Sequence, residues 1–134
     1  MVFALLSFSG CAQGDTPQVK EKKSGEVELE GRKSISCLEL QQAMAAGQKI
    51  LLLDVRSEGE YNAGHIPGAV LMPLNKLLAA PNDVPGKGDK TIVVYCASGY
   101  RSGKARSALI FADYPNVLHL EGDMSEWRNR QLPI

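Results

Sequence analysis

Two short runs of consecutive apolar residues mark the interior of this chain. Residues 50–53 and residues 92–95 consist only of leucine, isoleucine, valine and one tyrosine. A strand that is apolar at every position is buried on both faces, as in a parallel sheet. Two weaker runs, at residues 69–72 and 116–120, predict further strands. Residues 101–112 differ, because their apolar positions recur with the spacing of one helix face: Ala105, Ala108, Leu109 and Ala112.

Signals that begin a helix alternate with these predicted strands. Ser36 and Glu39 form a capping-box pattern, in which each side chain satisfies a backbone N–H of the first helical turn. Ser57 and Glu60 repeat the pattern. Further short helices are expected after Pro73 and near the C-terminus. Alternating strands and helices predict an α/β fold, with a parallel sheet covered by helices on both faces.

Cys96 lies where the second buried strand ends and the helix over residues 101–112 begins. Gly99, in the short segment between them, allows a backbone turn that a side chain would forbid, so that N–H groups can point at the sulfur. The positive end of the helix dipole adds to this effect. Cysteines in such surroundings serve as nucleophiles, although a buried structural cysteine is the simpler alternative. We therefore interpret residues 96–101 as an active-site loop.

Three stretches, in this order, resemble the rhodanese family. They are L-L-L-D-V-R-S-E-G-E-Y-N-A-G-H-I-P-G-A at 51–69, C-A-S-G-Y-R-S at 96–102, and L-E-G-D-M-S-E-W at 120–127. The resemblance covers residues 33–134. It implies a five-stranded parallel sheet of rhodanese type and sulfurtransferase activity through a persulfide on Cys96. It further implies a donor such as thiosulfate, cyanide or a thiol as acceptor, and no cofactor. The persulfide is expected to lie against residues 97–101: Ala97, Ser98, Gly99, Tyr100 and Arg101.

Two departures from the family pattern and two rival functions bear on this interpretation. Asp123 and Gln131 stand where the family usually has glycine, and both are expected on turns away from the sulfur.

Related phosphatases and arsenate reductases have one more residue between the cysteine and the arginine. Only four residues separate Cys96 from Arg101, which favours sulfur over phosphate. The other alternative is a non-enzymatic module that carries a persulfide or docks a partner.

Five further residues have assigned or open roles. The resemblance implies that Asp54 belongs to the framework beside the active-site loop. Arg56 could attract an anionic donor or pair with a nearby carboxylate, and Arg101 could bind the donor or brace the loop. His65 is expected to be a structural residue of its turn. Cys37 falls in a first helical turn and is interpreted as a packing residue.

The composition and the N-terminus set the remaining limits. A length of 134 residues predicts one domain, and we expect a monomer. Because the acidic and basic side chains are equal in number, no nucleic-acid partner is expected. The three cysteines form no C-x-x-C pair, and no metal site is expected.

Residues 1–11 look like a truncated lipoprotein signal that ends at Cys11, the candidate lipidation site. Residues 12–32 are interpreted as a flexible linker. This pattern predicts a periplasmic or membrane-anchored protein, with a cytoplasmic protein as the alternative.

Overall fold

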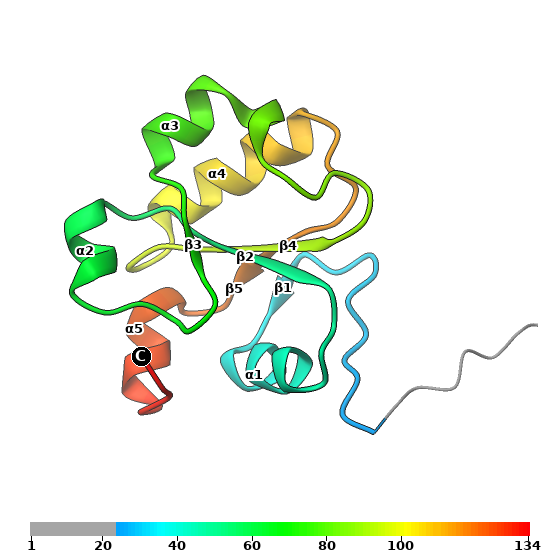
Figure 1. Cartoon of the computed structure of the whole chain (residues 1–134), viewed down its shortest axis with the longest axis vertical. Helices are drawn as coiled ribbons and strands as arrows, with labels where there is room; N and C mark the ends of the chain where they lie inside the picture. Colours follow the sequence, from blue (N-terminus) through cyan, green and yellow to red (C-terminus); the bar gives the residue numbers. More distant parts are fainter. Residues whose placement is uncertain (1–23) are drawn as a thin grey trace, which may run out of the picture.

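The computed structural model describes residues 24–134 as a layered α/β domain. Its sheet is parallel and five-stranded, in the order β1-β5-β4-β2-β3. The strands are β1 (Ser34–Ile35), β2 (Ile50–Asp54), β3 (Val70–Leu71), β4 (Thr91–Tyr95) and β5 (Val117–Leu120). The α-helices are α1 (Cys37–Ala45), α2 (Glu58–Asn62), α3 (Leu74–Ala79), α4 (Tyr100–Phe111) and α5 (Asp123–Asn129), with a 3₁₀ turn, η1, at Pro81–Asp83. Helices α3 and α4 cover one face of the sheet, and α1 and α5 cover the other (Figure 1). The predicted fold class is confirmed.

The central strands contribute to two cores because successive side chains of a strand point to opposite faces. The core on the α1 and α5 side includes Leu52, Val93, Tyr95, Leu118 and Trp127. The core on the α3 and α4 side includes Leu53, Ile92, Val94, Ala105 and Leu109. Cys96 belongs to this second core. The strand that precedes it, β4, lies between β2 and β5 in the middle of the sheet.

The predicted helix starts are confirmed, and one strand was not located from the sequence. Both capping boxes form, with Ser36 and Ser57 as the N-cap residues of α1 and α2. The element that the sequence pattern did not reveal is β1, which pairs with β5 through Ser34 and Ile35. Two residues are too few to show an alternating pattern, so the periodicity gave no signal there.

The end of the predicted linker packs against the domain. Leu29 is buried in the core on the α1 side. The side-chain amide of Gln48 donates to the backbone oxygen of Val27 at 2.9 Å and accepts from its N–H at 2.8 Å. Residues 27–29, at the C-terminal end of the predicted linker, are therefore held against the domain, with Val27 packed against the same core as Leu29. Cys11 and residues 12–23 of the predicted linker lie outside the described residues. No helix among residues 24–134 is long and apolar enough to cross a membrane.

Candidate active site

The turn between β4 and α4 brings a backbone N–H to the sulfur of Cys96. Gly99 is the N-cap of α4 and has a φ of 115°. Its N–H donates to the Sγ atom of Cys96 at 3.0 Å. Cys96 is 1% exposed, with its sulfur beside the start of a twelve-residue helix. Since α4 carries partial positive charge at this end, both the helix and the N–H of Gly99 favour negative charge on the sulfur.

Gly99 is required here for space as well as for its backbone conformation. A Cβ atom at this position would lie 3.1 Å from the Oδ2 atom of Asp123, and a φ of 115° is strained for any residue with a side chain. The absence of a side chain on Gly99 therefore lets a carboxylate on α5 lie directly against the loop.

Asp123 lies within the site, and the expectation that it is away from the sulfur is wrong. Its carboxylate is buried, and its Oδ1 atom accepts the backbone N–H of Cys96 at 2.9 Å. Its φ of 54° explains why a glycine fits the position, yet aspartate tolerates this region better than most residues. Burial acts to raise the pKa of Asp123, but hydrogen bonds from His119, the Cys96 N–H and Ser102 outweigh it and lower this pKa. The carboxylate therefore remains charged beside Cys96.

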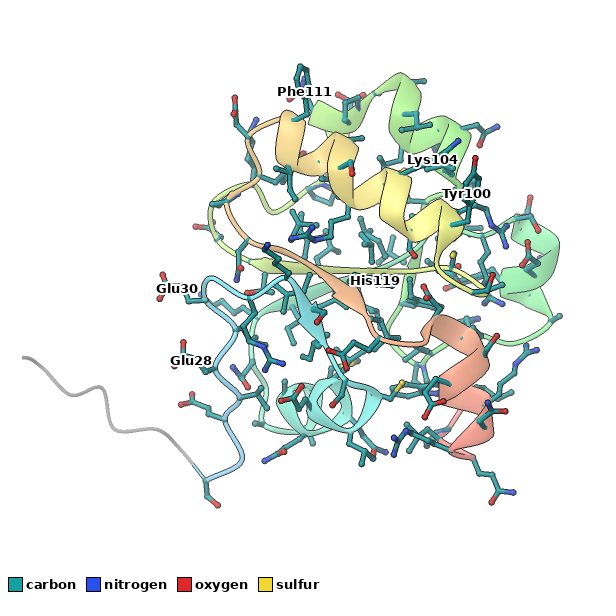
Figure 2. All side chains as sticks on the ribbon, turned by 180° about the vertical axis from the view of Figure 1, so that it is seen from behind. Glu28, Glu30, Tyr100, Lys104, Phe111 and His119 are labelled. Atoms are coloured by element: carbon teal, nitrogen blue, oxygen red, sulfur yellow. The ribbon has the colours of Figure 1, made fainter. Side chains whose placement is uncertain are left out.

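Ser102 and His119 complete a polar cluster around this carboxylate. The hydroxyl of Ser102 lies 3.4 Å from the Cys96 sulfur and 2.8 Å from Oδ1 of Asp123. Nε2 of His119 lies 3.0 Å from both oxygens of Asp123 and 2.9 Å from the Ser102 hydroxyl. Figure 2 shows His119 on β5, between α4 and α5. Sequence reasoning missed all three residues. The four-residue spacing of His119 and Asp123 is the one local signal that could have suggested the pair.

Backbone contacts from α5 hold the first residues of the loop. The N–H of Met124 donates to the carbonyl of Cys96 at 3.0 Å. The N–H and the hydroxyl of Ser125 both donate to the carbonyl of Ala97, at 3.1 and 2.8 Å. The loop is thus fixed from both sides, by α4 and by α5.

Arg101 braces the loop against α2. Its guanidinium group forms two hydrogen bonds with the carboxylate of Glu60, at 2.7 and 2.9 Å. These bonds to Arg101 are the main reason that the pKa of Glu60 falls to about 2. Of the two roles left open for Arg101, the structure shows bracing.

The other two loop side chains face outward. Ser98 and Tyr100 are exposed, with Tyr100 at 72%. Nζ of Lys104 lies over the Tyr100 ring, 4.5 Å from its centre, and the hydrogen bond with Lys104 lowers the pKa of Tyr100. In Figure 2 the side chains of Tyr100 and Lys104 lie on the outer side of α4, near its start. The side chains of Ser98 and Tyr100 are therefore turned to solvent, and the loop N–H that contacts the sulfur is that of Gly99.

Asp54 and Arg56 form a buried ion pair behind the loop. The exposed fractions of their side chains are 0% and 3%, and the closest approach, between Nη2 of Arg56 and Oδ2 of Asp54, is 2.6 Å. The hydroxyl of Tyr95 donates to Asp54 at 2.8 Å and accepts the N–H of Ile66 at 3.2 Å. Burial raises the pKa of Tyr95, which keeps that hydroxyl protonated. Arg56 thus pairs with a nearby carboxylate, the second of its two predicted roles.

Cys37 and His65 lie in structural positions, as expected. Cys37 is 1% exposed, its Sγ atom lies 3.6 Å from the carbonyl oxygen of Glu121, and burial raises the pKa of its thiol. The ring of His65 stacks on that of Tyr61 at 3.7 Å, and its Nδ1 atom contacts the carbonyl of Tyr61. Residues 24–134 contain no group of His, Cys, Asp or Glu side chains placed to hold a metal ion.

Comparison with known proteins shows the family. Residues 36–130 match the rhodanese-like domain, and the chain belongs to this family. A protein of Allochromatium vinosum named "Sulfurtransferase" is 35% identical over 95 residues, which cover 71% of this chain and 87% of the relative. The "probable adenylyltransferase/sulfurtransferase MoeZ" of Mycobacterium tuberculosis is 32% identical over 100 residues, but only 26% of that protein is covered. The structure of the human single-domain sulfurtransferase TSTD1 has a TM-score of 0.68 and 28% identity, covering 75% of this chain and 98% of the other.

Proposed function

We propose that this chain is a sulfurtransferase that moves a sulfane sulfur from a donor such as thiosulfate to cyanide or a thiol. The observation that carries the proposal is the Cys96 sulfur, which accepts the N–H of Gly99 at 3.0 Å beside the start of α4. Two relatives named as sulfurtransferases support it. Backbone donors and a helix dipole of this kind stabilise negative charge on the sulfur of a thiolate or a persulfide.

The proposed reaction has two displacement steps. The Cys96 thiolate attacks the outer sulfur of thiosulfate, so that a new S–S bond forms while the old one breaks and sulfite leaves with the electron pair. An acceptor thiolate or cyanide then attacks the outer sulfur of the persulfide, and Cys96 leaves as a thiolate. The N–H of Gly99 and the start of α4 favour negative charge on both the thiolate and the persulfide.

Intact-mass measurement before and after incubation with thiosulfate tests this function. The protein should gain the mass of one sulfur atom and lose it again with cyanide. Cys96→Ser should abolish both changes, whereas Cys37→Ser should keep them, because Cys37 packs against the core away from the loop. The proposal fails if Cys96→Ser still gains sulfur. Steady-state turnover with small thiols then separates a catalyst from a dedicated carrier.

A further inference from the structure

A hollow of about 200 Å³ lies beside the residue that follows Cys96. Its walls come from α2 and the residues around it, from the loop and from α5: Arg56, Glu60, Ala63, Ala97, Met124, Ser125 and Arg128. Figure 1 shows α2 and α5 on either side of the turn between β4 and α4. A molecule in this hollow therefore contacts Ala97, the residue that directly follows Cys96 in the loop.

Two of the charged side chains in the hollow are already paired. The guanidinium group of Arg56 is bound to Asp54, and the carboxylate of Glu60 is bound to Arg101. Arg128 differs from them, since within residues 24–134 it forms no ion pair and its side chain is exposed. Among the charged residues that line the hollow, Arg128 is thus the one without a partner of opposite charge in the described part of the chain.

The two arginines of the hollow meet at Gly64. Nη2 of Arg56 donates to the carbonyl of Gly64 at 2.8 Å. On the other side, a Cβ atom added to Gly64 would lie 3.6 Å from Nη2 of Arg128, so the glycine leaves room for this second guanidinium group. Two guanidinium groups close to the same residue make this place positively charged, which attracts an anion. The planar guanidinium group also matches the geometry of carboxylate and sulfonate oxygens.

We propose that the hollow binds the anionic group of a small sulfur compound, with Arg128 as the cation that holds it while the compound's sulfur meets Cys96. This subsite rests on the proposed function. The shared chemistry is a sulfonate or carboxylate group, carried either by the donor, as in thiosulfate, or by a thiol acceptor. Neither Arg56 nor Arg101 can supply this charge as well, because each is bound to a carboxylate.

Alkylation of Cys96 tests the subsite without any sulfur transfer. Iodoacetate and iodoacetamide differ in that only the first carries a carboxylate, and mass spectrometry of the Cys96 peptide gives both rates. Arg128→Gln should slow iodoacetate about tenfold, the effect of one lost hydrogen bond to a charged group, with little change for iodoacetamide. Arg128→Lys should restore a large part of the iodoacetate rate. The matched control is Arg130→Gln, which removes the same charge two residues away, where Arg130 pairs with Glu126 at 2.7 Å.

Sulfur-transfer measurements then distinguish donor from acceptor. If the donor's anion binds, Arg128→Gln should raise the thiosulfate concentration that half-saturates loading by about tenfold. The hydropersulfide of mercaptoethanol, which has no sulfonate or carboxylate and passes its outer sulfur to Cys96 while mercaptoethanol thiolate leaves, should load as before. If the acceptor's anion binds, unloading by mercaptoacetate should slow relative to mercaptoethanol. The subsite proposal fails if Arg128→Gln slows alkylation by iodoacetate and by iodoacetamide equally. It also fails if Arg130→Gln slows alkylation by iodoacetate as much as Arg128→Gln does. Failure of the wild-type protein to take up sulfur overturns the proposed function instead, and the alkylation ratio still decides the subsite.

Discussion

Substitution of Asp123 tests whether its carboxylate holds the active-site loop. The carboxylate is 1% exposed and accepts the N–H of Cys96, the hydroxyl of Ser102 and Nε2 of His119. Asp123→Ala removes all three interactions. It also places an alanine at a φ of 54°, where a Cβ atom is unfavourable.

The three lost interactions differ in their weight. The buried N–H of Cys96 is left without its acceptor, which costs about 1–3 kcal/mol. Ser102 keeps a second acceptor, the carbonyl of Gly99 at 3.1 Å, and contributes little. His119 is 29% exposed and can turn to water, so its lost pairing costs at most about 1 kcal/mol. With about 1 kcal/mol for backbone strain, Asp123→Ala should lower the free energy of unfolding by about 2–5 kcal/mol.

Two further variants separate the strain from the hydrogen bond. Asp123→Gly loses the same bonds without strain and should be less destabilising than Asp123→Ala by about 1 kcal/mol. Asp123→Asn keeps an oxygen for the Cys96 N–H and tolerates the backbone angle, so it should lose less than about 1 kcal/mol. The expected order of destabilisation is therefore Asn, then Gly, then Ala.

Urea denaturation followed by the fluorescence of Trp127, the single tryptophan of the chain, measures these differences. Asp113→Ala is the matched control, because Asp113 is exposed and has a φ of 66°, which reports the backbone strain alone. If Asp123→Ala costs no more stability than Asp113→Ala, the hydrogen bond from the Cys96 N–H to this carboxylate contributes nothing, and Asp123 does not hold the loop.

Two other ion pairs give predictions of the same kind. Asp54→Ala should destabilise the protein by about 3–5 kcal/mol in urea, because it leaves the buried Arg56 cation unpaired, and the added change Arg56→Met should recover part of this loss. Equal stability of the single and double variants would contradict that cause. Glu60 has its pKa lowered from 4.5 to about 2, so its contribution is complete above pH 4.5 and disappears as the pH falls towards 2. In Glu60→Gln, the free energy of unfolding should therefore fall less between pH 4.5 and 2 than it does in the wild type. The difference should be less than about 1 kcal/mol, because the Glu60 side chain is 37% exposed and its ion pair is screened by solvent. Glu58→Gln, on the same helix, serves as the control, and a wild-type slope in Glu60→Gln would count against the pairing.

The parts of the fold that sequence reasoning placed correctly are those set by local chemistry. A capping box lies within four residues, so Ser36 and Ser57 were recognisable from the chain alone. The turn from β4 to α4 was equally readable, because an apolar run, a cysteine and a glycine follow one another. Strand β1 was missed since its two residues are defined only by their pairing with β5.

The polar contacts of the site could not be read from the chain because they join distant residues. Asp123 meets Cys96 across 27 positions, and Glu60 meets Arg101 across 41. A pattern shows only that Asp123 replaces a glycine, and nothing in the spacing says where its side chain points. Likewise the choice between binding and bracing for Arg101 depends on a carboxylate from another helix.

The direction of Arg101 bears on the choice between sulfur and phosphate. A phosphate group carries charge on several oxygens, and a loop that holds it needs a cation directed inward as well as backbone N–H groups. Here the guanidinium group of Arg101 is bound to Glu60 by two hydrogen bonds, and Cys96 has a charged carboxylate, Asp123, behind its backbone. Such a loop favours one sulfur atom with a single charge, which the N–H of Gly99 and the start of α4 can stabilise. Recognition of a larger anion must then come from outside the loop, and Arg128 is the side chain in the adjoining hollow whose charge is available for it.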